Sequence, residues 1–541
     1  MKLSCITSIV ALLGLGSLAT ADIFRVDPEG QGDYLTINEA VDDVPDGSTI
    51  EISAGTYEEN ILLNDRDLTI RGTGVVNIQG CWDCHETRFR PVMHIAWGSN
   101  VTLDNINVTS QSDGHCGLWL EEVESATILN CNFSHNLIFG IRVSGQCGHI
   151  ELTDSDIREN SGTGLWIDDE MVGTTVVSGC VIADNVAPNL GVEHFKYCGG
   201  GIRAEGSSDH ETGASLHISD TTCIRNTTFL NGGGLFIGPG MEFVTINQCG
   251  FIDNQCRHPF SLGAAIGVSS KNIYRAHANS PDHSFSLRVK VDNTEFKRNR
   301  GSATGAIFLA DLVDGTVKFT ACTFENNESA TYGGAVVMMG LAESNISFIA
   351  CMFKRNSAQI GGAFYIRDSG SNLNVLIDKS ELRSNLVTYS RPREGASIRN
   401  MDPFQVHVRN STICDGYAPI VGGWVDDNNV YQTDCTFQSC CLSGHCSDKP
   451  EMECLEHGGT WHGNMSCDEV VCDPIEGACC LGSWCATMTE SECDQHNGVY
   501  QGNGSKCEPG YTCEPRNPAD FDLNGKVDVD DLMKFFDYWG K

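Results

Sequence analysis

A short alternation of polar and apolar residues recurs between residues 104 and 435. A Cys, Ser or Thr is followed two residues later by an apolar residue and usually five residues later by Asn, as in Cys131-Phe133-Asn136. Most copies are 24 to 31 residues apart, and a fixed period of this size is typical of a solenoid whose repeats stack on one another. The clear copies begin at Cys131, Ser155, Cys180, Thr221, Cys249, Thr294, Cys322, Cys351 and Ser380, and weaker copies begin at Asp104, Ser411 and Cys435.

A second apolar stretch follows each Asn, usually after one or two glycines, as in Gly140-Ile141-Arg142-Val143. Side chains of a β-strand alternate between its two faces, so the outer residues of such a triplet point inward and the middle one points outward. The recurrent residues Asn136 to Asn385 tolerate the left-handed conformation, and their amides can bond the backbone of adjacent rungs as a ladder. The pattern therefore predicts an all-β solenoid stacked on an Asn ladder.

A capping element precedes the first strands. Ile37, Ala40, Val41 and Val44 recur at helical spacing. We expect Thr36 to be the N-cap of this short helix, with Glu39 at the capping-box position. Such a cap is required because an uncovered solenoid end exposes core and unpaired strand edges.

The N-terminal region resembles a known family. Gly32-Asp33-Tyr34 and Gly55-Thr56-Tyr57-Glu58-Glu59-Asn60 are similar to the start of right-handed parallel β-helix proteins of the pectin-lyase-like superfamily. The resemblance covers roughly residues 24 to 438. It implies a right-handed parallel β-helix and a role at extracellular polysaccharide.

The first 21 residues predict a secretory signal peptide. Lys2 supplies the positive start, Ile6–Leu18 the apolar stretch, and Ala19-Thr20-Ala21 a small-residue cleavage site. We therefore expect a secreted protein, extracellular or at the cell surface. The formal net charge of −36 argues against nucleic acid or an anionic membrane as partner, and no later segment is apolar enough for a membrane span.

The C-terminal tail has a different composition. Residues 440–513 hold 12 cysteines in two similar runs of six, which favours two small disulfide-held modules in an oxidising compartment. Six cysteines allow 15 connectivities, so the pairing stays open, and zinc ligation is the alternative. We divide the chain into the signal peptide 1–21, the β-helix 22–438, modules at 439–473 and 474–514, and a terminal segment 515–541.

The terminal segment contains a candidate Ca²⁺ loop with a short helix after it. Side-chain oxygens stand at loop positions 1, 3, 5, 9 and 12, and a backbone carbonyl serves position 7. The ligands would be Asp520, Asp522, Asn524, Lys526, Asp528 and Asp531. Asp531 replaces the usual Glu of an EF-hand, and this shorter carboxylate reaches the ion less easily as a bidentate ligand. The segment resembles one half of a dockerin module, and this resemblance implies a cohesin-like protein partner.

The outward-facing residues that follow the glycines form a second candidate site. Rung by rung, this column is Trp119, Arg142, Trp166, Arg203, Phe236, Gly267, Phe308, Val337, Tyr365, Ile398 and Val425. Exposed aromatic rings in a row suit sugar rings, so we predict substrate binding by Trp119, Trp166, Phe236, Phe308 and Tyr365. Packing under inserted loops is the alternative.

Charged residues stand in and beside the N-terminal part of this column. Glu121, Asp168 and Glu205 lie two residues beyond Trp119, Trp166 and Arg203. Carboxylates beside Arg can serve acid–base catalysis or bind calcium. If the protein is catalytic, we expect Arg142 or Arg203 as base or orienting group, and Glu121, Asp168 and Glu205 as acids or calcium ligands.

The altered or missing motifs of known enzymes argue against catalysis. Trp166-Ile167-Asp168-Asp169 is similar to a Trp-Ile-Asp-His motif of pectate lyases, but Asp169 replaces the His. The polygalacturonase and pectin methylesterase motifs are missing. The leading hypothesis is a secreted β-helix protein that binds extracellular polysaccharide and, in a catalytic version, degrades it as a polysaccharide lyase or glycoside hydrolase. The alternative is a non-catalytic adhesion or stalk protein of the cell surface.

Overall fold

The computed structural model describes two units, separated between Thr433 and Asp434. In the first unit it describes residues 22–80, 91–110, 116–187, 199–207, 213–258, 263–269, 286–370, 372–388, 395–402, 406–415 and 419–431. In the second unit it describes parts of 437–507. The predicted signal peptide and the predicted Ca²⁺ loop with its helix lie outside the described residues. In the described part, no helix is long and apolar enough to cross a membrane.

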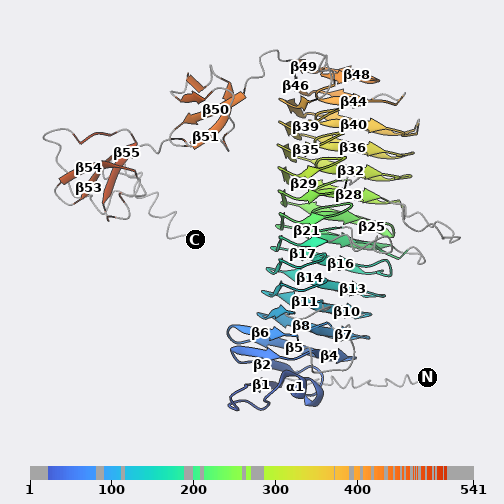
Figure 1. The fold of residues 1–541 in the computed structure, drawn as a ribbon, viewed down its shortest axis with the longest axis vertical. Coiled ribbons are helices and arrows are strands. Elements are labelled where there is room, and N and C mark those ends of the chain that lie inside the picture. Colours follow the sequence, from blue (N-terminus) through green and yellow to red (C-terminus); the bar gives the residue numbers. More distant parts are fainter. Residues whose placement is uncertain are drawn as a thin grey trace, which may run out of the picture. The chain divides into compact units, whose positions relative to one another are not determined.

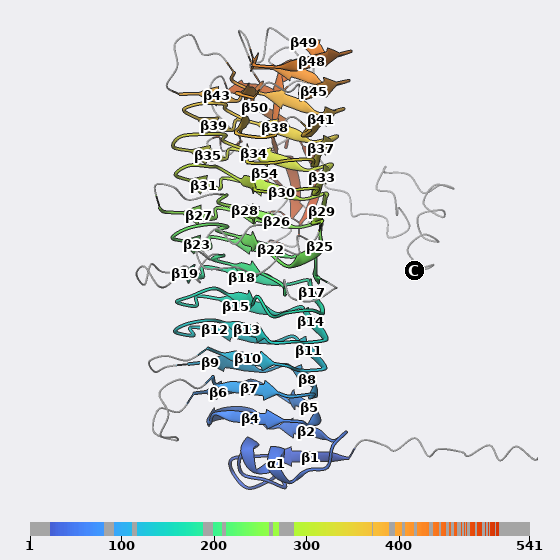
Figure 2. The ribbon, with the colours of Figure 1, turned by 90° about the vertical axis from the view of Figure 1, so that its right-hand side faces the viewer.

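The first unit is a stack of rungs that runs from β1 and α1 at one end to β48 and β49 at the other (Figures 1 and 2). Each rung between the two ends contributes one strand to each of three parallel sheets. Sheet A consists of β1 (Ile23–Val26), β2 (Thr49–Ile52), β5 (Asp67–Gly72), β8 (Asn100–Asp104), β11 (Ser125–Leu129), β14 (His149–Thr153), β17 (Thr174–Ser178), β21 (Ala214–Ser219), β25 (Met241–Asn247), β29 (Arg288–Asp292), β33 (Thr316–Thr320), β37 (Asn345–Ile349), β41 (Asn374–Asp378), β45 (Val406–Arg409) and β48 (Trp424–Asp427).

Sheet B follows sheet A in each rung. It consists of β3 (Gly55–Glu58), β6 (Val76–Gln79), β9 (Asn107–Thr109), β12 (Asn132–Ser134), β15 (Asp156–Arg158), β18 (Val181–Ala183), β22 (Thr222–Ile224), β26 (Gly250–Ile252), β30 (Glu295–Lys297), β34 (Thr323–Glu325), β38 (Met352–Lys354), β42 (Glu381–Arg383), β46 (Thr412–Cys414) and β49 (Val430–Tyr431). A short sheet D lies at the next corner, with β19 (Val186–Ala187), β23 (Thr227–Thr228), β27 (Gln255–Cys256), β31 (Arg300–Gly301), β35 (Glu328–Ser329), β39 (Ser357–Ala358) and β43 (Leu386–Val387).

Sheet C completes the rung and contains the predicted site. Its strands are β4 (Ile61–Asn64), β7 (Met93–Ala96), β10 (Leu118–Glu121), β13 (Ile141–Ser144), β16 (Leu165–Ile167), β20 (Ile202–Ala204), β24 (Leu235–Ile237), β28 (Ile266–Ser269), β32 (Ile307–Ala310), β36 (Val336–Met339), β40 (Phe364–Arg367), β44 (Ile398–Asn400) and β47 (Ile420–Val421). The described strands form a parallel β-helix, as predicted.

One continuous apolar core fills the solenoid. In its C-terminal half, like residues stack on consecutive rungs. Phe296 lies 5.3 Å from Phe251 and 4.7 Å from Phe324, between ring centroids, and Phe353 continues the row at 4.6 Å from Phe324. The period of the sequence puts the same residue type at the same inward position of each rung, and close packing of these rings stabilises the stack.

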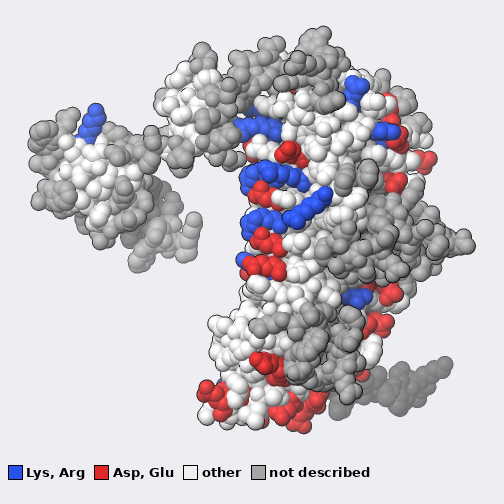
Figure 3. All heavy atoms as spheres, in the orientation of Figure 1, with Lys and Arg blue, Asp and Glu red and all other residues white. Residues whose placement is uncertain are grey.

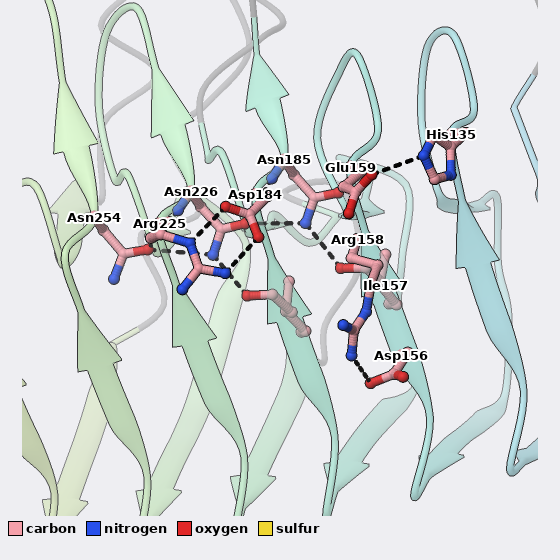
Figure 4. A network of polar contacts seen from close by, with 11 residues as sticks. His135, Asp156, Ile157, Arg158, Glu159, Asp184, Asn185, Arg225, Asn226 and Asn254 are labelled. Atoms are coloured by element: carbon pink, nitrogen blue, oxygen red, sulfur yellow. Dashed lines mark hydrogen bonds and ion pairs between the residues drawn. The ribbon is translucent and has the colours of Figure 1, made fainter.

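The recurrent Asn residues form the predicted ladder (Figure 4). The Asn185 side chain donates from Nδ2 to Asn226 Oδ1 at 2.9 Å and to the Ile157 carbonyl at 2.9 Å, while its Oδ1 accepts from the Asn160 amide at 3.1 Å. The left-handed residue is not the Asn but the one before it, such as Asp184 at φ 57° and Arg225 at φ 53°. Our prediction that Asn recurs because it tolerates the left-handed conformation was therefore wrong. Asn recurs because its buried side chain hydrogen-bonds the adjacent rungs.

Charged residues occupy several of these left-handed positions and pair across rungs. Arg225 reaches Asp184 at 2.6 Å, and His135 Nε2 lies 2.7 Å from Glu159 (Figure 4). These side chains are exposed, so each pair contributes at most about 1 kcal/mol. Figure 3 shows basic and acidic side chains alternating along the edge where β35 and β39 lie.

The Cys, Ser or Thr that opens each copy bonds the backbone at the corner between sheets A and B. Ser155 Oγ accepts from the Cys131 amide at 3.0 Å and donates to the Thr153 carbonyl at 2.8 Å. Cys131 Sγ donates in the same way to the Leu129 carbonyl at 3.1 Å. Burial raises the pKa of the Cys180 thiol to about 11, so this thiol keeps its proton. The three residue types are interchangeable here because each is a small donor.

The capping helix α1 (Ile37–Asp43) is present, and Thr36 Oγ1 accepts from the Glu39 amide at 3.2 Å. Ile37, Ala40 and Val41 are its buried residues. The carboxylate that binds the first amides of the helix is Glu59, at 3.0 Å from the Ile37 nitrogen. It comes from the end of β3, so the sequence spacing of a capping box could not reveal it.

The second unit contains two small antiparallel sheets, with β50 (Phe437–Leu442), β51 (His445–Pro450) and β52 (Thr460–His462) in one and β53 (Gly477–Leu481), β54 (Trp484–Met488) and β55 (Val499–Asn503) in the other. The disulfides join Cys440–Cys454, Cys441–Cys472 and Cys446–Cys467 in the first module, and Cys479–Cys493 and Cys485–Cys507 in the second. Every described cysteine of the tail is oxidised. The sulfur atoms of Cys441, Cys446 and Cys472 lie within 4.8 Å of one another, but each belongs to a disulfide, so in this oxidised form none is a thiolate that could bind zinc.

Candidate functional site

The outer face of sheet C brings the predicted Trp and Arg residues together on consecutive strands. Trp119 pairs in register with His94 on one side and Arg142 on the other. Arg142 pairs with Trp166, and Trp166 with Arg203. Strand spacing in a sheet is about 4.8 Å, so these side chains lie one rung apart. We call His94, Trp119, Arg142, Trp166 and Arg203 the Trp–Arg stack.

Aromatic rings and guanidinium groups alternate in the Trp–Arg stack. The His94 and Trp119 rings are stacked, with 4.7 Å between centroids. The Arg142 Cζ lies 4.6 Å from the Trp119 centroid and 4.8 Å from that of Trp166, and the Arg203 Cζ lies 5.5 Å from Trp166. Cation–π contacts of this kind contribute roughly 0.5–2 kcal/mol each. The stack is therefore a rigid surface element with its rings already oriented.

Each predicted carboxylate binds a basic member of the stack. Glu121 lies 2.9 Å from His94, Asp168 lies 3.2 Å from Arg142, and Glu205 accepts from Arg203 Nε at 2.8 Å. Ser144 accepts from Trp119 Nε1 at 2.6 Å. These carboxylates do not form a shared metal site, because among the described residues no three His, Asp or Glu side chains come close enough to hold one ion. Their role as acids or calcium ligands stays a prediction.

The two ends of the Trp–Arg stack differ in how deeply their side chains are buried. Asp168 is 5 % exposed and Arg203 8 %, and burial is the main cause that raises the pKa of the Asp168 carboxyl. His94, Trp119 and Arg142 are only partly buried. Among the described residues, the stack is therefore more open at its His94–Trp119–Arg142 end than at Arg203.

The prediction that the aromatic binding residues are exposed is wrong for all of them except Trp119. Trp166 is 8 % exposed and packs with Phe139 at 4.7 Å between centroids. Phe236, Phe308 and Tyr365 are 3–5 % exposed. Trp166 packs against Phe139 and Tyr365 against Tyr332, and both partners come from corner segments.

The strand register shows that the last two residues of the predicted outward column, Ile398 and Val425, were assigned wrongly. Tyr365 pairs with Arg399, and Arg399 with Val421. Ile398 points inward and is fully buried, and Val425 belongs to β48 in sheet A. The glycine rule fails at Ile398 because Ala396 stands where the preceding rung has its second glycine. It fails at Val425 because the last glycine pair follows the sheet C strand β47 instead of preceding it.

Two aromatic residues of this face escaped the sequence reasoning. His94 lies before the first clear copy, although Met93-His94-Ile95 has the same inward–outward–inward alternation. Trp97 follows at the end of β7 and is 54 % exposed. A shallow pocket of about 340 Å³ at the sheet D corner was also missed. Arg300 and Glu328 lie at its rim, 3.6 Å apart and well exposed.

Comparison with known proteins supports the fold. A family model described as a right-handed β-helix region matches residues 61–212 and 93–280. The comparison with curated proteins found no match. Among solved structures, a pectate lyase named Pel9A is 12 % identical with a TM-score of 0.32, covering 68 % of this chain and 79 % of that chain.

Two further structures resemble the chain at similar levels. Pectin methylesterase from carrot is 12 % identical with a TM-score of 0.27, covering 69 % of this chain and 86 % of that one. The catalytic unit of an α-1,3-glucanase from Streptomyces thermodiastaticus is 15 % identical with a TM-score of 0.42, covering 78 % and 70 %. These three TM-scores lie below 0.5, so the right-handed parallel β-helix rests on the family model and on the strand pairing of the structure.

Proposed function

We propose that this protein binds extracellular polysaccharide at the His94–Trp119–Arg142 end of the Trp–Arg stack, with the β-helix as a rigid platform. The observation that supports this most is the Arg142 guanidinium held between two Trp rings. Aromatic rings bind the apolar faces of sugar rings, and guanidinium groups donate hydrogen bonds in a fixed geometry. The solenoid places both kinds of group on one face at rung spacing.

An unsatisfied donor of Arg142 supports a ligand at this place. In the described part of the chain, Arg142 Nε has no hydrogen-bond partner. A buried polar group without a partner costs about 1–3 kcal/mol. A sugar hydroxyl is an acceptor that would satisfy such a donor.

Binding is better supported than cleavage. A glycosidase needs one carboxyl to protonate the leaving group and another to act as base or nucleophile. Here Asp168 and Glu205 are buried and paired with Arg142 and Arg203. An arginine paired with a carboxylate is also a poor base. The roles of Arg142, Arg203, Glu121, Asp168 and Glu205 in catalysis stay predictions, whereas their ion pairs hold the stack in place.

We also propose secretion and a calcium-binding tail. The oxidised tail modules agree with an extracellular location. The Ca²⁺ loop of Asp520 to Asp531 is supported by the spacing of its oxygen ligands alone. The cohesin-like partner is supported only by the resemblance of this segment to half of a dockerin module.

The direct test is affinity electrophoresis of the full chain in gels that contain one soluble polysaccharide each. We expect retardation of the wild type and its loss in Trp119→Ala. The matched control is Trp424→Ala in the last rung of sheet A, which should migrate like the wild type. Equal retardation of Trp119→Ala and the wild type would reject this site. Reducing-sugar release or ultraviolet absorbance of unsaturated products would instead establish cleavage.

A further inference from the structure

Trp97 occupies a corner position that holds Asp, Glu or Gly in other rungs. The residue after each of several sheet C strands is left-handed, with φ of 53° at Asp65, 52° at Glu122 and 71° at Gly145. Asp311, Gly340 and Asp368 repeat this in the C-terminal half. Trp97 occupies the same position at φ 51°. Among these described corner residues, the others are Asp, Glu or Gly.

Neither backbone nor packing accounts for a tryptophan there. A bulky residue in the left-handed region is strained by about 1–2 kcal/mol. The ring is 54 % exposed, and within the described residues it stacks on no other ring. The fold would be at least as stable with glycine, so a ligand explains Trp97 better than stability does.

Carboxylates stand on both sides of Trp97. Backbone hydrogen bonds place Asp65 one rung before it and Glu122 one rung after it, because the Asp65 amide donates to Ala96 and the Gly98 amide to Glu122. Both side chains are exposed. In the part of the chain that the structure describes, neither carboxylate belongs to an ion pair. They are therefore free to accept hydrogen bonds from a ligand.

The group of Trp97, Asp65 and Glu122 adjoins the more open end of the Trp–Arg stack. Trp97 follows His94 by three residues at the end of β7. Glu122 follows Glu121, which binds His94 at 2.9 Å. A polymer on His94 and Trp119 would reach Trp97 by extending toward the corner of the same rungs.

We propose that Trp97, with Asp65 and Glu122, forms a second subsite that stacks one ring of an uncharged polysaccharide. This inference rests on the proposed polysaccharide binding and adds the class of polymer. The indole face binds the apolar face of a sugar, and the two carboxylates accept hydrogen bonds from its hydroxyls. The same carboxylates repel uronates. Figure 3 shows acidic side chains gathered at the end of the solenoid that contains β1 and α1, which strengthens this repulsion.

The test compares wild type, Trp97→Gly and Trp119→Ala on two groups of probes. The neutral probes are soluble β-glucan, dextran and galactomannan, and the acidic probes are polygalacturonate and alginate. We expect the wild type to bind a neutral probe, and Trp97→Gly to bind it about tenfold more weakly or worse. The melting temperature of Trp97→Gly should equal or exceed that of the wild type, because glycine relieves the left-handed strain. Val75→Ser, at another exposed apolar position (69 % exposed), is the control and should bind normally.

The outcomes separate the two proposals. Full binding by Trp97→Gly with loss in Trp119→Ala would overturn the Trp97 subsite and leave the proposed function intact. A wild type that binds only acidic probes would overturn the neutral class. Absence of binding to every probe would overturn both. In Asp65→Asn/Glu122→Gln, binding of acidic probes should increase relative to neutral ones, and an unchanged ratio would contradict the assigned role of the carboxylates.

Discussion

The outer face of sheet C has two halves that share a backbone and differ in chemistry. In the N-terminal half the outward position holds the Trp–Arg stack, satisfied by carboxylates from the same face. In the C-terminal half the same position holds Phe308, Val337 and Tyr365, which form an apolar cluster with Tyr332 stacked 4.5 Å from Tyr365. The inward positions are apolar in both halves. The solenoid thus constrains its inside and leaves the outside free for function, which we place in the N-terminal half.

Arg142→Ala should have the largest effect and should act on the N-terminal half alone. It removes the partner of buried Asp168, which should lower the free energy of unfolding by about 3–5 kcal/mol near neutral pH. Polysaccharide binding should be lost as well. Burial already raises the pKa of Asp168 above its ordinary value, and without Arg142 it rises further. The loss of stability therefore shrinks as pH falls and the carboxyl takes up a proton.

Urea unfolding at neutral and acidic pH measures this change. Adding Asp168→Asn to Arg142→Ala should restore most of the stability, because no buried charge is left unpaired. A double variant as unstable as the single one would show that the ion pair is not the cause.

Phe308→Ala should damage the C-terminal half without affecting binding. Phe308 is 5 % exposed in the apolar cluster, and truncation of a buried Phe costs about 3 kcal/mol or more. Thermal unfolding and affinity electrophoresis on the same sample check both expectations. Weaker binding by the folded variant would mean that the ligand site extends into the C-terminal half.

Asp415→Asn should change the pH dependence of the C-terminal half. Asp415 ends the Asn ladder, accepting from the Asn385 amide at 2.8 Å and from Asn385 Nδ2 at 2.9 Å. Burial raises the pKa of Asp415 to about 6, against roughly 3.9 in an unfolded chain. Stability from this group is complete below pH ~4 and falls by about 3 kcal/mol as pH rises through 6, because the unfolded chain ionises first. Asn should remove this slope, and an unchanged slope in unfolding experiments would assign it to other groups.

Removal of calcium should have the smallest effect on either half. The described residues of the solenoid contain no site with three carboxylate or imidazole ligands, so a chelator should leave its melting temperature unchanged. Terbium luminescence of the full chain should instead report the predicted tail loop, and Asp520→Ala/Asp522→Ala should abolish the signal. A signal that persists in this variant would place the ion elsewhere.

The sequence determined the architecture because the fold is periodic. A constant repeat length and an inward–outward alternation identify every buried position of a regular rung, so the β-helix, the Asn ladder and the adjacency of Trp119, Arg142, Trp166 and Arg203 were all predictable. The prediction failed where the glycine pattern changes, at Arg399 and in the last rungs.

Exposure of the outer face could be found only in the tertiary structure. Period and alternation say which way a side chain points, but not what lies over it. Trp166 is covered by Phe139, and Tyr365 by Tyr332, both from corner segments that do not follow the strand alternation. Likewise, Glu121, Asp168 and Glu205 were predicted together, while their pairing with His94, Arg142 and Arg203 depends on rotamers and burial. Long-range packing therefore decided which end of the stack is more open.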